Sequence, residues 1–182
     1  MRLVSVFALL LPSFALSSGV GAESNVTQVS QTPPSGTTEL RDWFTEFIPA
    51  LFPNTTTHWK KRFDDGTIAP KIYGTFNGLT FHGSAALRRS LLGSSCIITS
   101  RLDSYVIEPT QITAAASDPQ GRNGWVVYSG KTSLVTKEGE VYTEGLASVF
   151  ATVEWDAVLE KRTVTEYREV NTPPNSPNYP WN

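Results

Sequence analysis

The order of two residue patterns along the chain constrains its fold more than any other feature. Apolar residues recur at helical spacing in the first third of the sequence, and four long runs rich in Val, Thr, Tyr and Ile occupy most of the rest. These β-branched and aromatic residues fit a pleated surface. Helices followed by a long sheet predict an α+β fold, with the helices segregated to one face of the sheet.

The helical part begins at Thr37, where Thr-Thr-Glu-Leu supplies a cap and an early acidic residue. One apolar stripe follows and ends at Pro53 and Asn54; it consists of Leu40, Trp43, Phe44, Phe47, Ile48 and Leu51. A shorter helix is expected over residues 58–63, and extended chain with glycine turns leads to Phe81. A third helix is predicted over residues 85–92, ending at Gly93.

The strand part is predicted over residues 104–117, 125–136, 141–155 and 158–170. Short turns join the later runs, so we expect an antiparallel meander. The lone Cys96 is expected to be buried beside two isoleucines, or else to be a free thiol that pairs between chains.

Both ends of the chain differ from this core. Residues 1–22 have one basic residue, an apolar run and small residues, the pattern of a cleavable secretory signal peptide. A membrane anchor is the alternative, but Pro12 interrupts a run that is too short for a bilayer. We predict a flexible linker over residues 23–36, the folded domain over 37–170 and a Pro/Asn-rich flexible tail over 171–182, in a secreted or secretory-pathway protein.

Charge and composition argue against several functions. The net charge is −2, and it becomes −3 when Arg2 is removed with the signal peptide, so a general nucleic-acid binder is disfavoured. One cysteine and two histidines argue against a disulfide framework and a zinc site. Glycine-rich phosphate loops and hydrolase elbows are absent from the sequence, which disfavours nucleotide-dependent enzymes and serine hydrolases, and we expect no metal site. Two sequons, at Asn25 and Asn54, are candidate glycosylation sites.

Three short motifs in the folded part resemble the nuclear transport factor two-like superfamily, in particular its SnoaL-like branch. Residues 62–65 (RFDD) are similar to its "F-A-D-D", residues 81–87 (FHGSAAL) to its "G-x-x-A-I/L", and residues 166–169 (EYRE) to its "E-Y-x-D". The resemblance covers residues 37–170. It implies a cone-shaped curved antiparallel sheet with about three N-terminal helices enclosing a pocket, and often a homodimer packed through the sheet.

The resemblance also implies a chemistry. SnoaL-like and ketosteroid-isomerase-like members need no cofactor and move protons on carbonyl compounds, with a carboxylate or histidine as base and a hydrogen-bond donor that holds the enolate. The isomerase branch carries its base five residues after the second Asp of the Asp-Asp pair. That position is Pro70 here, which has no group that can accept a proton.

Candidate residues therefore come from spacing. His82 stands where an extended segment meets the third helix, and could exchange a proton at the cavity wall or only bind backbone. Tyr128 shares a strand face with apolar residues and could point into the pocket or pack in the core. Glu144 is a buried acid–base group if its face lines the cavity, and a surface charge if it does not. Aromatic residues expected to contact a substrate are Tyr73, Phe81 and Trp125.

Two functional hypotheses remain open. The first is a cofactor-free cyclase, isomerase or dehydratase that acts by acid–base chemistry on an apolar polyketide- or terpenoid-like molecule. The second is a non-catalytic secreted protein that binds a ligand or partner on the same fold; the scarcity of histidine and the presence of Pro70 favour it. We adopt the enzyme as the working hypothesis.

Overall fold

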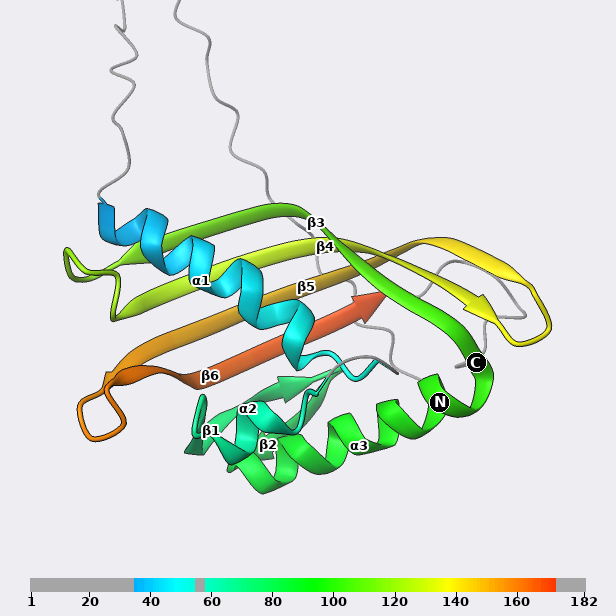
Figure 1. The fold of residues 1–182 in the computed structure, drawn as a ribbon, viewed down its shortest axis with the longest axis horizontal. Helices are drawn as coiled ribbons and strands as arrows, with labels where there is room; N and C mark the ends of the chain where they lie inside the picture. Colours follow the sequence, from blue (N-terminus) through cyan, green and yellow to red (C-terminus); the bar gives the residue numbers. More distant parts are fainter. Residues whose placement is uncertain (1–34, 55–57, 173–182) are drawn as a thin grey trace, which may run out of the picture. The chain divides into compact units, whose positions relative to one another are not determined.

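One mixed six-stranded sheet organises the computed structural model, which describes residues 35–54 and 58–172. The strand order is β2-β1-β6-β5-β4-β3. Three helices lie on one side of the sheet (Figure 1). The elements are α1 (Ser35–Leu51), α2 (Lys61–Asp64), β1 (Ile68–Phe76), β2 (Leu79–His82), α3 (Ser84–Arg101), β3 (Leu102–Ala116), β4 (Gly124–Thr136), β5 (Val141–Asp156) and β6 (Lys161–Thr172).

Helix α1 forms because its apolar residues fall on one face. The buried residues of this stripe are Leu40, Phe44, Phe47, Ile48 and Leu51. They pack on β3 and β4. Trp43 lies at the edge of the stripe and is partly buried, with its ring stacked on Phe47 at 5.2 Å. The predicted helix is confirmed and begins two residues earlier than expected, at Ser35.

Helix α3 is longer than the sequence predicted. It continues through Gly93 to Arg101, so the expected end at Gly93 is wrong. Leu87, Leu91 and Ile98 lie on its buried side, facing β1 and β3, and this burial outweighs the roughly 1 kcal/mol cost of a glycine inside a helix. Cys96 lies on the exposed side of α3, so the expectation that it is buried is also wrong.

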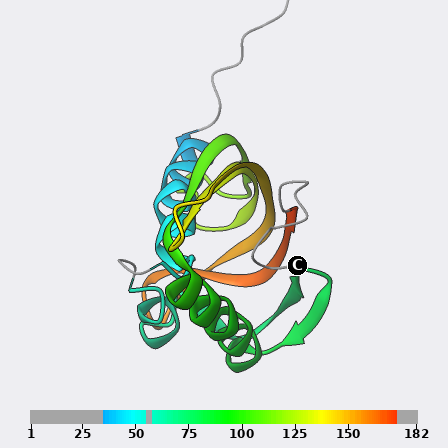
Figure 2. The ribbon, with the colours of Figure 1, turned by 90° about the vertical axis from the view of Figure 1, so that its right-hand side faces the viewer.

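Strands β3 to β6 form the predicted antiparallel meander. The last strand starts at Lys161, three residues later than expected, because residues 157–160 make the turn. The sheet is strongly curved, as the end-on view shows (Figure 2). The predicted α+β fold with a curved sheet is confirmed, but the sheet is not wholly antiparallel, because β1 pairs with β6 in parallel.

The predicted end segments lie largely outside the described residues. This applies to the signal peptide at 1–22, to positions 23–34 of the predicted linker and to positions 173–182 of the predicted tail. Ser35 and Gly36 belong to α1, and Asn171 and Thr172 belong to β6, so the ordered elements extend two residues beyond each expected boundary. None of the helices within residues 35–54 and 58–172 is long and apolar enough to cross a membrane.

Candidate functional site

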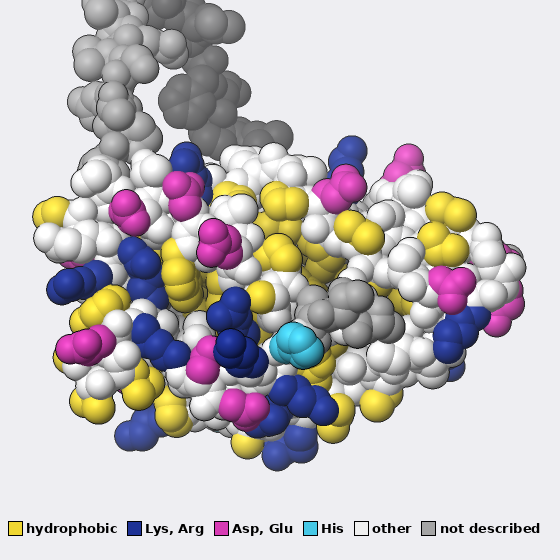
Figure 3. Space-filling model, in the orientation of Figure 1, with side chains coloured by type: hydrophobic (Ala, Val, Ile, Leu, Met, Phe, Trp, Pro, Cys, Tyr) yellow, Lys and Arg dark blue, Asp and Glu magenta, His cyan; other side chains and the backbone are white. Residues whose placement is uncertain are grey.

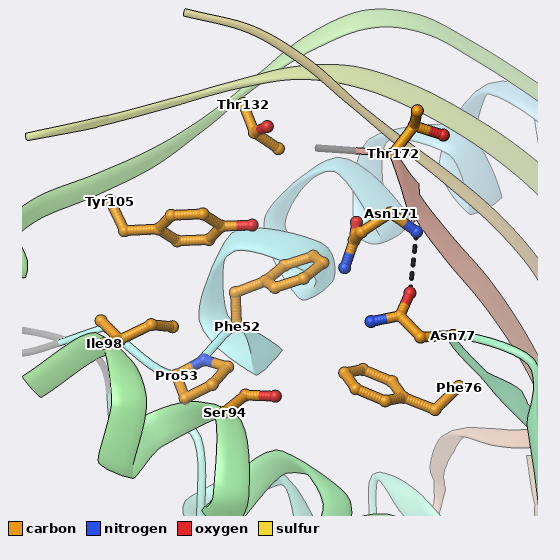
Figure 4. A pocket seen from close by; sticks show the side chains of 10 residues that line it. All are labelled: Phe52, Pro53, Phe76, Asn77, Ser94, Ile98, Tyr105, Thr132, Asn171 and Thr172. Atoms are coloured by element: carbon orange, nitrogen blue, oxygen red, sulfur yellow. Dashed lines mark hydrogen bonds between the residues drawn. The ribbon is translucent and has the colours of Figure 1, made fainter. Parts of the chain in front are cut away.

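A cavity of about 130 Å³ opens between the helices and the inner face of the sheet (Figure 4). The ends of α1 and β1, the middle of α3 and residues on β3, β4 and β6 supply its walls. Its lining residues are Phe52, Pro53, Phe76, Asn77, Ser94, Ile98, Tyr105, Thr132, Asn171 and Thr172. In Figure 4 the Tyr105 hydroxyl and the Asn171 side chain point toward each other across this space.

A buried carboxyl group lies directly behind this wall. Glu169 is 0% exposed. Its Oε2 accepts a hydrogen bond from the Tyr167 hydroxyl at 2.5 Å, and its Oε1 accepts one from Asn171 Nδ2 at 2.5 Å. Glu169 is therefore one hydrogen bond away from the cavity.

The alternation of β6 places these groups together. Side chains two residues apart on a strand share a face, so Tyr167, Glu169 and Asn171 all point inward. Glu166 and Arg168 point outward and form an ion pair at 2.6 Å between Arg168 Nε and Glu166 Oε1. The backbone fixes the end of the strand, because the Asn171 N–H donates to Asn77 Oδ1 at 2.8 Å and the Asn77 N–H donates to the Glu169 carbonyl at 3.0 Å.

The environment of Glu169 changes its acidity. Burial raises the pKa of this carboxyl to about 7, against the opposing effect of the hydrogen bonds from Tyr167 and Asn171. Burial and the nearby Glu169 charge raise the pKa of Tyr167 well above its ordinary value. Near neutral pH, Glu169 can therefore both take and give a proton, whereas Tyr167 acts only as a hydrogen-bond donor.

Tyr128 lies fully buried on the inner face of β4, next to this group. Burial first and the Glu169 charge second raise the pKa of Tyr128 to about 12, so its phenol stays protonated. Its ring extends over Gly130, where a Cβ would lie 2.6 Å from the Tyr128 hydroxyl oxygen. Glycine is therefore the residue that leaves room for the phenol. Within residues 35–54 and 58–172, the buried Tyr128 hydroxyl and Asn171 Oδ1 have no hydrogen-bond partner.

Comparison with known proteins identifies the fold. No protein-family model matches the sequence, and no curated protein matches it. Among solved structures, Aln2 from a Streptomyces species is 10% identical with a TM-score of 0.57, over 78% of this chain and 93% of that chain. A candidate scytalone dehydratase from Novosphingobium aromaticivorans is 9% identical with a TM-score of 0.53, over 74% of this chain and 83% of that chain.

A third similar structure comes from the C. albicans Mtr2–Mex67 M domain complex, at 12% identity and a TM-score of 0.52, over 78% of this chain and 99% of that chain. The protein has the nuclear transport factor two-like fold. The resemblance inferred from the short sequence motifs is confirmed at the level of the fold.

Within the nuclear transport factor two-like fold, the predicted acid–base residues do not meet. His82 ends β2 with an exposed side chain, and Glu144 is exposed at a bulge of β5 with a φ of 72°. Tyr128 alone is buried, and none of the three lines the cavity. Of the two positions that the sequence allowed for Glu144, the structure shows the surface one. The inner face of β5 carries the odd-numbered residues.

The predicted substrate-contacting aromatic residues also occupy different places. Phe81 is buried in the core. Tyr73 is 46% exposed on the outer sheet face, where its hydroxyl donates to Glu166 Oε2 at 3.1 Å. Trp125 is 41% exposed. None of the three lines the cavity, and their contact with a substrate stays a prediction.

The two glycosylation predictions differ in what the structure describes. Asn25 lies outside the described residues. Asn54 is half-buried, and its Nδ2, the atom to which a glycan attaches, donates to the Tyr105 carbonyl at 3.0 Å. This bond holds the end of α1 against β3 beside the cavity.

The remaining surface features concern charge and metals. On the face that carries the helices, basic and acidic side chains are interspersed, with apolar side chains between them (Figure 3). In the described part of the chain, no three His, Cys, Asp or Glu side chains are grouped so that they could hold a metal ion.

Proposed function

We propose that the protein is an acid–base enzyme of the isomerase, cyclase or dehydratase type that works without a cofactor. The proposal rests on the environment of Glu169. Its buried carboxyl group has a pKa raised to about 7 and accepts a hydrogen bond from Asn171 of the cavity wall. The similarity to a structure described as a candidate scytalone dehydratase supports the same class of reaction.

The proposed reaction uses the groups around the cavity. Glu169 in its ionised form takes a proton from a carbon next to a substrate carbonyl, and the negative charge moves to the carbonyl oxygen. The Tyr105 hydroxyl, which points into the cavity, donates a hydrogen bond to that oxygen. Glu169 then returns the proton to another carbon, which completes an isomerisation, or to a departing hydroxyl group, which leaves as water.

Asn171 controls access to the carboxylate in this proposal. Asn171 Nδ2 donates a hydrogen bond to Glu169 Oε1 in the structure. The amide must therefore turn before this carboxylate oxygen can reach a substrate carbon. The same rotation directs Nδ2 into the cavity, where it can stabilise an enolate oxygen. Among the apolar polyketide- or terpenoid-like substrates expected from the sequence, a cavity of about 130 Å³ favours a small member.

Proton exchange at carbon tests the enzyme hypothesis without knowledge of the natural substrate. We expect the purified protein to accelerate hydrogen–deuterium exchange next to the carbonyl of small cyclic ketones and enones in D₂O, followed by NMR. Glu169→Gln should lose about 100-fold or more of this rate, because the base is removed. Glu166→Gln is the matched control, since Glu166 lies on the outer face of the same strand, and should keep the rate. Exchange no faster than in buffer for the whole panel contradicts the proposal.

A non-catalytic ligand-binding protein is the second candidate. The observation that favours it is that both oxygens of Glu169 are already hydrogen-bonded and the side chain does not line the cavity. Under this alternative, Glu169 only orients Asn171. Ligand binding without any carbon-bound proton exchange would support it.

Secretion and dimerisation belong to the same proposal. The signal-peptide pattern of residues 1–22 supports secretion, and sequencing of the mature N-terminus tests it. A homodimer through the outer sheet face is supported by a group of exposed apolar side chains there, Trp125, Val127, Leu146 and Val170. The strand register puts these on one face, because Val127 is opposite Phe150, Trp125 opposite Thr152 and Val170 opposite Ser148.

A further inference from the structure

The size of the cavity limits its ligand to about one ring. Its volume is about 130 Å³. An apolar protein cavity of roughly 150 Å³ holds a benzene molecule. A ligand that enters without a rearrangement of the walls is therefore monocyclic or of similar volume.

The walls suit a ring of that size. Phe52, Pro53, Phe76 and Ile98 form the apolar part, supplied by three different segments of the chain. Figure 4 shows the rings of Phe52 and Phe76 at the edge of the space that separates Tyr105 from Asn171. Flat apolar walls of this kind favour an aromatic or cyclic ligand over a branched polar one.

One polar atom of the wall requires a donor. Asn171 Oδ1 is buried and has no hydrogen-bond partner among the residues that the structure describes. In the structure, Asn171 presents its NH₂ group to Glu169, which suits the ionised carboxylate because that form only accepts hydrogen bonds. The carbonyl oxygen is thereby left for the cavity. A buried acceptor without a partner is destabilising, and a ligand that donates a hydrogen bond to it removes that cost.

The charges around the cavity select against anions. No Lys, Arg or His among the described residues lines it. Glu169 is hydrogen-bonded to the cavity wall through Asn171, and its negative charge repels an anionic ligand. A carboxylate-bearing ligand would lose its hydration without gaining a counter-ion.

We infer that the cavity binds a neutral single-ring molecule with a hydroxyl group, of the phenol or cyclic enol class, whose O–H donates to Asn171 Oδ1. This inference deepens the proposed function by naming the ligand class of the same cavity. It concerns equilibrium binding, so it can hold or fail independently of whether Glu169 transforms the ligand.

Titration of the unmodified protein with four probes tests it. Phenol carries the ring and the donor, toluene has the ring alone, benzoate adds a negative charge, and 2-naphthol adds a second ring. Calorimetry should show phenol binding at least about 10-fold tighter than toluene, since one hydrogen bond to a buried orphan acceptor is worth about that factor. Benzoate and 2-naphthol should bind more weakly than phenol. Equal affinities for phenol and toluene, or preference for benzoate or 2-naphthol, would overturn the inference.

Two variants locate the site. Asn171→Leu should reduce the preference for phenol over toluene to about 1, because the acceptor is removed while apolar contact remains. Glu166→Gln is the matched control on the outer face of the same strand, away from the cavity, and should keep the preference. If Asn171→Leu does not fold, the four-probe comparison on the unmodified protein still decides. A protein that binds phenol selectively but exchanges no carbon-bound protons would contradict only the proposed enzyme.

Discussion

Glu169 is the residue whose environment differs most from that of an ordinary carboxyl group. It is fully buried on the inner face of β6, and two donors, Tyr167 and Asn171, hold it. Burial disfavours its charged form, and two hydrogen bonds only partly offset this, so the pKa is raised to about 7. The same residue therefore links the proposed chemistry to the stability of the fold.

The pH dependence of stability follows from this shift. The folded pKa of Glu169 is about 7 and the unfolded value is 4.5, so the folded state binds more protons between these values. The contribution of Glu169 to the free energy of unfolding is therefore largest below about pH 4.5. It falls by about 3 kcal/mol as the pH rises through 7. Urea unfolding at pH 5 and pH 8 measures the loss.

Glu169→Gln is the control for this prediction. Glutamine keeps the acceptor for Tyr167 but does not titrate, so the variant should lose most of the difference between pH 5 and pH 8. A variant with the same pH dependence as the original protein would assign the effect to other groups.

At the scale of elements, glycines at two positions have opposite roles. Gly93 lies on the exposed side of α3, where a Cβ would have no atom within 4 Å. A Cβ at Gly130 on β4 would instead meet the Tyr128 hydroxyl at 2.6 Å and the Glu108 carbonyl at 2.9 Å. Helix α3 therefore tolerates its glycine, and β4 requires one.

Alanine substitutions should show this contrast. Gly93→Ala is expected to stabilise the protein by about 0.5–1 kcal/mol, because alanine loses less backbone entropy in a helix. Gly130→Ala should destabilise it by about 1–3 kcal/mol, because the Tyr128 phenol must move in a packed core. Thermal unfolding of the two variants measures both changes. A lower melting temperature for Gly93→Ala, or an unchanged one for Gly130→Ala, would contradict the assignment.

The elements also show what the sequence could predict. Long runs of β-branched residues and the α1 stripe identified the meander and the first helix, because each pattern is local and regular. The end of α3 was missed, because burial of Ile98 through contacts with distant strands outweighs the local preference of Gly93. The parallel β1–β6 pair was missed because no local pattern records which distant strands meet.

The candidate site was predicted only in part. The sequence singled out Tyr128, which is buried beside the carboxyl group, but passed over Glu169 and Asn171. One signal was available: Glu166 and Arg168 fit an outward ion pair, so the intervening strand positions Tyr167 and Glu169 must face inward. The cavity itself could not be predicted, because Tyr105, Ile98 and Asn171 come from elements far apart in the chain.

At the scale of the whole molecule, the outer sheet face is the surface through which we propose that two copies associate. We expect a homodimer in solution, because Val127, Leu146 and Val170 expose apolar side chains on neighbouring strands. Val127→Lys combined with Val170→Lys should shift the protein to the monomer in sedimentation experiments, because burying four unpaired charges in a dimer is costly.

A pair of lysines elsewhere provides the control for assembly. Val158 and Leu159 are exposed in the turn before β6, away from the outer face, so the same substitutions there should leave the dimer intact. A monomer before any substitution would contradict the prediction of a dimer.

The parallel pairing of β1 with β6 has a consequence for how the chain acquires its fold. Tyr73 is opposite Glu166 and Phe76 is opposite Glu169, so residues nearly a hundred positions apart must meet. During synthesis, the hairpin of β1 and β2 has no neighbour in the sheet until the final strand leaves the ribosome. Pairing between strands so far apart in the sequence slows folding, because the chain loses loop-closure entropy before the contacts between the strands can form. We therefore expect the sheet to form only after β6 has been synthesised. The same strand carries Glu169, so the sheet and the candidate site are completed together.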